Sequence, residues 1–319
     1  MFRQPSCSFG VLANQEKEDT TMATQSTPVP ATEGQIKHAI RLVTDATDKA
    51  LHELALDKDA MQRFVELGVV GIMPHVLTLL RGLALMDEFA DEEVESEYGY
   101  LSGYKQANAA TDQFAAIKSI FPQAESYDMA LAAKDAPVGS EGNFLILPWQ
   151  KVAPTYREAV EIVLAKLKET RNGRFQNSRN GQLGPSYLRE GDKKIKAMKK
   201  IAVEQSGHDV LVVSTQLGIR HRGRSVRRAL AVMSGNEIGL GAYEIGFILL
   251  THQNRLQHFD GLWIDAAGDE FAPDADGDFC RAPCFDFDGG GLGFDAYDVD
   301  NPHEYCGSAS AFVVVVPSE

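Results

Sequence analysis

One segment in the second half of the chain combines the signals for a mixed fold of strands and helices. It contains in order HDVLVVS (208–214), RHRGRSVRR (220–228), IGLGAYEIGFILL (238–250) and LWID (262–265). Short runs rich in Val and Ile indicate buried strands, whereas longer apolar runs indicate buried helices. The sequence therefore predicts a strand, a basic loop leading into a helix, a buried helix, and a second strand.

The chain before this segment is mostly helical in pattern. A capping box, Thr32-Glu-Gly-Gln35, precedes apolar residues at helical spacing. Strand signals first appear at Phe144–Leu147, after a loop rich in Gly, Ser and Asn. Further helices are expected over 34–56, 57–67, 74–86, 106–121, 126–134, 154–168 and 193–203.

The remaining parts of the chain differ in composition. Residues 171–184 form a polar loop, and short strands are expected at Cys284–Phe287 and Phe312–Val316 in an acidic tail. The fold class that we predict is α+β, in which a helical N-terminal region packs on a mixed α/β C-terminal body with a strand-rich acidic tail. The expected divisions are a disordered tail (1–33), a helical region (34–135) and an α+β domain (136–319).

The composition indicates a soluble, cytoplasmic protein. Four cysteines in 319 residues do not form a disulfide scaffold. The first residues lack the apolar region of a secretory signal, and Met22 offers a second translation start. The longest apolar stretch, 69–86, is interrupted by Pro74, His75 and Arg81, so no membrane span is expected.

Charge is distributed unevenly along the chain, whose formal net charge is −14. Residues 1–150 carry 11 Lys and Arg against 22 Asp and Glu, whereas residues 231–319 carry 2 against 16. Residues 151–230 reverse this balance, with 18 basic against 7 acidic residues. An acidic chain is no general polyanion binder, but its basic centre permits a local phosphate or nucleic-acid site. Alternatively, the basic and acidic parts face one another.

The first candidate site is the arginine-rich turn after the strand at 208–214. Several guanidinium groups beside a helix that begins at Ser225 would suit a phosphate, which accepts paired N–H bonds and is attracted to a helix N-terminus. Neither a P-loop nor a Rossmann fingerprint is present. The alternative is that these arginines pair with aspartates of the tail. The candidate residues are Arg220, Arg222, Arg224, Ser225, Arg227 and Arg228.

The apolar segment 238–250 contains Gly239, Gly241 and Gly246. A helix accepts such glycines where another backbone approaches closely. Its Glu244, like Glu237 just before it, is a carboxylate among apolar residues and requires a partner or a raised pKa. Glu244 is thus a candidate acid or base, an arginine partner, or a member of a structural ion pair.

Two metal sites are conceivable in the tail. Carboxylates at Asp265, Asp269 and Glu270 have the oxygen ligands that hard divalent cations prefer. The nearby run DADGD (274–278) resembles a calcium loop in composition but lacks the EF-hand pattern. Soft ligands occur as two close pairs, which is what a structural zinc site requires. These pairs are Cys280 with Cys284, and His303 with Cys306.

Three runs, LGIRHRGRSVRRA (217–229), LLTH (249–252) and LWIDAAGDEF (262–271), carry a resemblance. They resemble uncharacterised proteins of proteobacterial integrative and conjugative elements over about the C-terminal third of the chain. The resemblance implies a setting on mobile DNA and brings no known activity, cofactor or fold.

These observations give three hypotheses for function. The first is an accessory protein of a mobile element that binds nucleic acid or a phosphorylated ligand through its arginine-rich turn. The second is a hydrolase or nuclease that depends on a divalent metal ion. The third is a structural protein that self-associates as a homo-oligomer through its charged faces. No catalytic triad or zinc-protease motif is present.

Overall fold

The computed structural model describes residues 32–54, 56–68, 72–73, 76, 88–233 and 235–313. The chain forms two units, one made of residues 8–77 and the other mainly of residues 78–319. The helices between 106 and 134 belong to the unit that contains the sheet. The divisions at 33 and 135 stay predictions.

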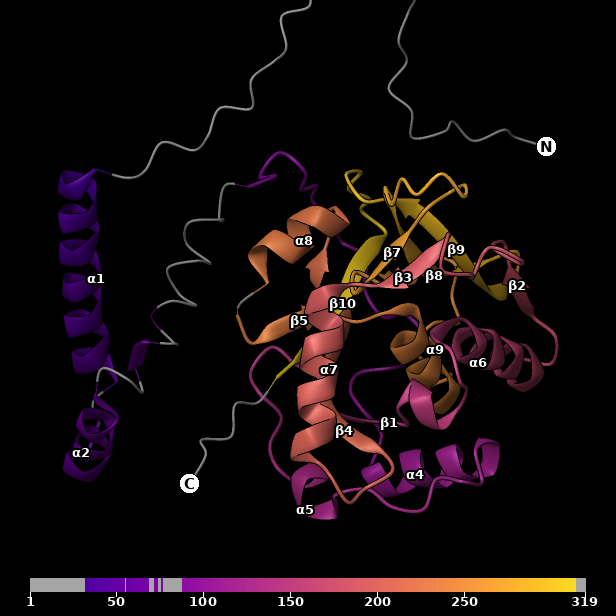
Figure 1. The fold of residues 1–319 in the computed structure, drawn as a ribbon, viewed down its shortest axis with the longest axis horizontal. Coiled ribbons are helices and arrows are strands. Elements are labelled where there is room, and N and C mark those ends of the chain that lie inside the picture. Colours follow the sequence, from indigo (N-terminus) through magenta and orange to yellow (C-terminus); the bar gives the residue numbers. More distant parts are fainter. Residues whose placement is uncertain are drawn as a thin grey trace, which may run out of the picture. The chain divides into compact units, whose positions relative to one another are not determined.

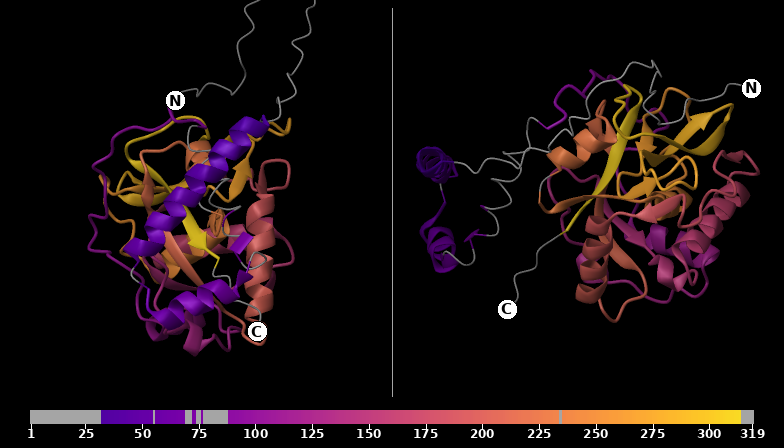
Figure 2. Two further views of the ribbon diagram at one scale, coloured as in Figure 1. Left: turned by 90° about the vertical axis from the view of Figure 1, so that its left-hand side faces the viewer. Right: turned by 45° about the horizontal axis from the view of Figure 1, so that its top comes forward.

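The described part of the smaller unit consists of α1 (Glu33–Glu53) and α2 (Lys58–Glu66), drawn in indigo in Figure 2. The predicted capping box is present, since Thr32 Oγ1 accepts from Gln35 N and the Gln35 side chain accepts from Thr32 N. No residue of either helix is buried. The helix expected over 74–86 lies almost entirely outside the described residues.

The larger unit is built on a mixed sheet, in which ten strands are described. The strand order is β1-β4-β10-β6-β8-β7-β3, with β5 beside β10, and β9 pairing with both β8 and β2. The strands are β1 (Gly142–Ile146), β2 (Phe175–Asn177), β3 (Leu188–Glu190), β4 (Leu211–Arg222), β5 (Glu237–Gly239), β6 (Trp263–Asp265), β7 (Asp269–Phe271), β8 (Arg281–Asp288), β9 (Gly291–Asp298) and β10 (Cys306–Phe312).

Helices pack around this sheet, and α6 and α9 lie side by side (Figure 1). Gly246 of α9 allows this close approach, since a Cβ there would lie 2.7 Å from Val163 Cγ1 of α6. The helices are α4 (Ala110–Ile120), α5 (Met129–Ala132), α6 (Tyr156–Thr170), α7 (Asp192–Glu204), α8 (Val226–Val232) and α9 (Ala242–Thr251), with a 3-10 turn η1 (Trp149–Lys151).

The predicted α+β class is confirmed, with helices first in the chain, a mixed sheet with helices, and a strand-rich later part. The strand at 262–265 and the helix beginning after Ser225 are also confirmed. Among the described helices, none combines the length and apolar character needed to span a membrane.

Two expectations about the central segment are corrected. The strand expected over 208–214 continues to Arg222, so Arg220 and Arg222 lie on β4 and not in a loop. The helix expected over 238–250 begins only at Ala242, and its first residues form β5, which pairs with β10. Pairing with neighbouring strands thus extended one strand and created another, which local sequence does not reveal.

Candidate metal centre and adjoining cleft

Three neighbouring strands bring an aspartate and two cysteines together on one face of the sheet. Asp265 of β6 is directly opposite Cys284 of β8, and Cys306 of β10 is in register with Trp263 of β6. Residues paired across strands share a face, and alternate residues along a strand point to opposite faces. Phe285 therefore points away from this cluster, and it packs in the main core.

The metal-binding atoms of Asp265, Cys284 and Cys306 all lie within 4.8 Å of one another. The three residues are 6%, 0% and 2% exposed. Cys284 Sγ donates to the Phe285 carbonyl at 3.6 Å, and its thiol also interacts with Cys306 and with the Asp265 carboxylate. Two soft ligands and one carboxylate form a donor set that suits Zn²⁺. We call these three residues the Asp-Cys-Cys cluster.

In the absence of a cation, burial disfavours the ionised forms of the three side chains in this cluster. It raises the pKa of Asp265 to about 6 and that of Cys306 to about 11. Burial, followed by the hydrogen bond with Cys306 and the charge of Asp265, raises the pKa of Cys284 well above its ordinary value. A bound divalent ion would reverse this effect, because it stabilises the thiolate and carboxylate forms that ligate it.

A buried hydroxyl without a hydrogen-bond partner lies beside the cluster. Ser308 of β10 is in register with Asp265 and is fully buried, and its Oγ has no partner in the described structure. A buried polar atom without a partner costs free energy, so native proteins seldom retain one. Ser308 Oγ is therefore available to a ligand atom or water that reaches this face of the sheet.

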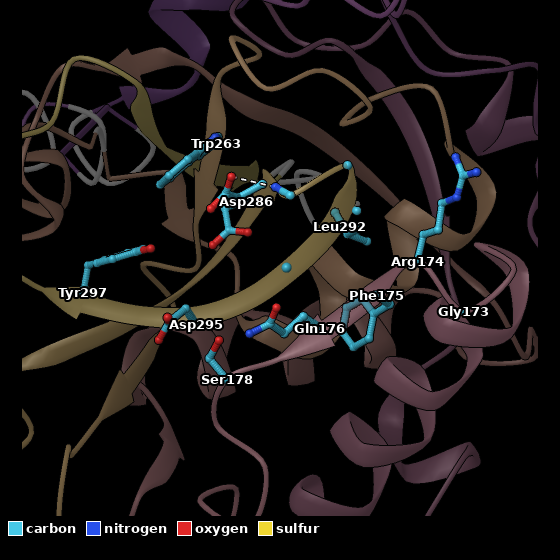
Figure 3. A pocket seen from close by; sticks show the side chains of 15 residues that line it. Gly173, Arg174, Phe175, Gln176, Ser178, Trp263, Asp286, Leu292, Asp295 and Tyr297 are labelled. Atoms are coloured by element: carbon cyan, nitrogen blue, oxygen red, sulfur yellow. Dashed lines mark hydrogen bonds between the residues drawn. The ribbon is translucent and has the colours of Figure 1, made fainter. Parts of the chain in front are cut away.

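A cleft of about 380 Å³ (Figure 3) is lined by Trp263 and Asp286, which lie two residues along β6 and β8 from Asp265 and Cys284, whereas no residue of the cluster lines it. Strands β6, β8 and β9 contribute Trp263, Asp286, Asp295 and Tyr297, and the segment around β2 contributes Arg174, Gln176 and Ser178. The Trp263 and Tyr297 rings stack with centroids 6.2 Å apart.

The cleft is acidic and is held open by small residues. Burial and the neighbouring carboxylates of Asp295 and Asp288 raise the pKa of Asp286 to about 6. Arg179 forms an ion pair with Asp295 at 2.5 Å. Gly293 lies opposite Asp286, and a Cβ at that glycine would collide with Asp286 Oδ1. A larger residue at 293 would therefore displace the carboxylate from the cleft.

The structure brings together only part of each metal site that the sequence suggested. Asp269 lies apart from the cluster, bound to Lys194, and Glu270 pairs with Arg189 on the surface. Cys280 is disulfide-bonded, and His303 stacks on Tyr305 with centroids 5.0 Å apart. None of these four residues belongs to the Asp-Cys-Cys cluster. The remaining residues of the two expected sites, Asp265, Cys284 and Cys306, form one site.

Sequence reasoning did not find the cleft residues Asp286, Asp295, Trp263 and Tyr297. One signal was available, since the glycine run after Asp288 indicates a hairpin turn. Alternate residues on both sides of such a turn share a face, which would have grouped Asp286 with Cys284 and Tyr297 with Asp295.

The candidate arginines form ion pairs and hydrogen bonds with several partners. Arg227 pairs with Glu92, Arg228 and Arg224 pair with Glu93, and Arg220 pairs with Glu237. Arg222 donates to the Tyr98 carbonyl at 2.9 Å. Ser225 caps α8, and its hydroxyl donates to Glu92. The carboxylates in these pairs come from the acidic run at 88–93 and from β5, and not from the tail.

Glu237 and Glu244 each have a cationic partner. Burial raises the pKa of Glu237, but hydrogen bonds from His221 and Ser310 and the charge of Arg220 outweigh it and lower the value to about 2. Glu244 contacts Lys194 Nζ at 3.2 Å and accepts from Gly241 N at the start of α9. Among the alternatives expected for Glu244, the structure shows an ion pair. Its partner is Lys194 and not an arginine.

A comparison with known protein families, curated proteins and solved structures gives no match for this chain.

Proposed function

We propose that this chain is a metal-dependent hydrolase that holds a zinc-class divalent ion at the Asp-Cys-Cys cluster. The observation that carries the proposal is the convergence of three ligating atoms within 4.8 Å on three adjacent strands, two of which also contribute Trp263 and Asp286 to the lining of a cleft. Catalytic zinc sites use three protein ligands and leave a fourth position for water or substrate. The cluster supplies three such ligands among the described His, Cys, Asp and Glu residues.

The charge of the cleft narrows the class of substrate. Asp286, Asp288 and Asp295 line it, and Arg174 is the basic residue among its lining side chains. Arg179 offsets the charge of Asp295, and Asp286 and Asp288 outnumber Arg174, so a neutral or cationic substrate fits better than a nucleic acid. When bound, the ion would polarise a carbonyl or activate a water molecule. Trp263 and Tyr297 offer aromatic surfaces to an apolar part of the substrate.

Metal content tests this proposal directly. We expect one zinc per chain, measured by mass spectrometry of the metal after purification under reducing conditions, and thiolate charge-transfer absorption after cobalt substitution. The variants Cys284→Ser, Cys306→Ser and Asp265→Asn should each lose most of the metal. The matched control is Asp288→Asn on the same strand as Cys284, which should retain it.

Activity forms the second part of the test. A panel of neutral esters and amides should be hydrolysed by the zinc-loaded chain and not by Cys284→Ser. A folded chain that retains no metal and develops no cobalt-thiolate absorption would overturn the metal site. Full metal binding without hydrolysis of any substrate in the panel would remove the hydrolase part of the proposal.

A second candidate function is binding of phosphate groups by the outer faces of the arginines. The observation in its favour is that Arg222 is exposed and that the side chains of Arg220 and Arg227 are each 40% exposed despite their carboxylate partners. Electrophoretic mobility shifts with DNA and RNA at two salt concentrations would test it. A salt-sensitive shift that Arg222→Ala/Arg224→Ala abolishes would support it, and no shift would reject it. Self-association stays a prediction, to be measured by sedimentation.

A further inference from the structure

A second group of charged side chains lies around Lys194 of α7. This lysine is 1% exposed, and its Nζ contacts three carboxylates. The distances are 3.1 Å to Glu190, 3.2 Å to Glu244 and 2.7 Å to Asp269. Tyr156 completes the group, because its hydroxyl donates to Asp269 and accepts from Lys194 at 3.0 Å.

The charges of this group do not balance. One ammonium faces three carboxylates, and the N-terminus of α9 adds roughly half a positive charge. That helix end binds two of the carboxylates, since Ala242 N donates to Asp269 and Gly241 N donates to Glu244. Lys194 and the helix end together supply about one and a half positive charges, which offset only half of the three carboxylate charges. Glu190 is left in excess.

Burial of the excess charge is unfavourable in the absence of a counter-charge. The effect is visible at Glu190, whose pKa is raised by burial and by Glu244 and Asp269, against the opposing charge of Lys194. Glu190 thus requires either a proton or a further cation.

A pocket of about 320 Å³ opens onto the same carboxylates. Glu190 and Glu244 are its acidic lining residues, and Lys199 at its edge is exposed, so that its charge is screened by water. The remaining walls are mainly apolar. They include Ile146, Trp149, Ile195, Met198, Leu211 and Tyr243. Ile195 is 43% exposed, which leaves apolar surface at the pocket for a ligand to cover.

We propose that this pocket binds a small organic cation, a primary ammonium group on a compact apolar body. The ammonium lies against Glu190 and Glu244 and supplies the positive charge that the buried group lacks. The apolar body packs on Trp149, Met198 and Ile195. An anionic ligand is excluded for two reasons. Lys194 is already surrounded by three carboxylates, and the pocket is lined by Glu190 and Glu244 and not by Lys194.

Titration calorimetry on the full chain tests this assignment with ligands that share one body and differ in charge. We expect 2-phenylethylamine to bind with saturation, 2-phenylethanol to bind at least about ten-fold more weakly, and 3-phenylpropionate not to bind. Equal affinity for the amine and the alcohol, or no binding of the amine, would overturn the proposal.

Variants locate the bound amine. Glu190→Gln should reduce amine affinity at least about ten-fold and leave the alcohol unaffected, and it should fold normally because it removes the excess charge. Glu204→Gln, on the exposed surface of α7, is the control carboxylate and should bind like the parent chain. Asp286→Asn tests the other acidic cleft. If Asp286→Asn lost amine binding and Glu190→Gln retained it, the assignment would be overturned.

Discussion

At the scale of single residues, His252 is held as a neutral base. Its Nε2 accepts a hydrogen bond from Asn108 N at 3.0 Å, and Nδ1 lies 3.3 Å from the Ile248 carbonyl. An acceptor nitrogen cannot also carry a proton, so protonation breaks the contact with Asn108. Burial lowers the pKa of His252 to about 4.

The contribution of His252 to stability should therefore fall as the pH is lowered through the window between about 6.5 and 4. In this range His252 binds a proton in the unfolded chain but not in the folded chain, so its contribution to stability rises with pH. The full effect is on the order of 3 kcal/mol. Urea unfolding at several pH values would measure it. His252→Gln should flatten the pH dependence, whereas the exposed His258→Gln should not, and identical slopes in the parent and His252→Gln would contradict the prediction.

A second residue-scale prediction concerns Ser225. Its Oγ accepts from Arg228 N at 3.1 Å, which caps α8, and it donates to Glu92. Ser225→Ala should lower the free energy of unfolding by about 1–2 kcal/mol, because it removes a cap and a buried hydrogen bond. Chemical denaturation would show this. Ser119→Ala, on exposed helix surface, is the control, and an equal loss in both variants would contradict the capping role.

Residue identities predicted individual roles better than they predicted partners. Ser225 was expected to begin a helix from its type alone, and it does. The partner of Arg227 could not be found in the same way, because Glu92 lies 135 positions away. The Asp-Cys-Cys cluster has the same origin, since sequence reasoning assigned Asp265 and the two cysteines to different sites. Only strand register brings them together.

At the scale of elements, the contact between α6 and α9 depends on Gly246. A Cβ at this position would lie 2.7 Å from Val163 and 3.2 Å from Phe285. Gly246→Ala gains about 1 kcal/mol of helix propensity but forces two packed elements apart, at a cost of about 1–3 kcal/mol. We therefore expect a net loss of about 1 kcal/mol.

Thermal or urea unfolding of Gly246→Ala would measure this loss. Gly99→Ala serves as the control because nothing lies within 4 Å of the added Cβ. A stability equal to or above that of the parent chain would mean that the helices can separate at no cost.

The sequence pattern did not predict strands in segments whose residue types are uncommon in strands. Strand β9 contains two glycines and two aspartates, residues that are depleted in strands, and it was not expected. It forms because it pairs with β8 along eight residues, which places Phe294 in the core. Apolar helices such as α6 were predicted well, since periodicity within a helix is a local property.

At the scale of the whole molecule, the fold class followed from the order of the patterns along the chain. The sheet order did not, because it depends on contacts between distant segments. Charge shows the same contrast. One alternative was that the chain's basic middle meets its acidic segments, and the arginines near α8 do so, with the run at 88–93. Composition thus indicates that the basic segment pairs with acidic residues, but the fold determines that these residues are Glu92 and Glu93.

Strand β10 follows every other described strand in the chain, yet it lies inside the sheet between β4 and β6. During synthesis, the strands on either side of β10 therefore each have an unpaired inner edge. These edges stay unpaired until Phe312 has left the ribosome. Pairing between such distant segments is slow, and open edges invite aggregation. Nascent chains arrested before β10 should remain sensitive to protease, and those arrested well beyond it should become resistant.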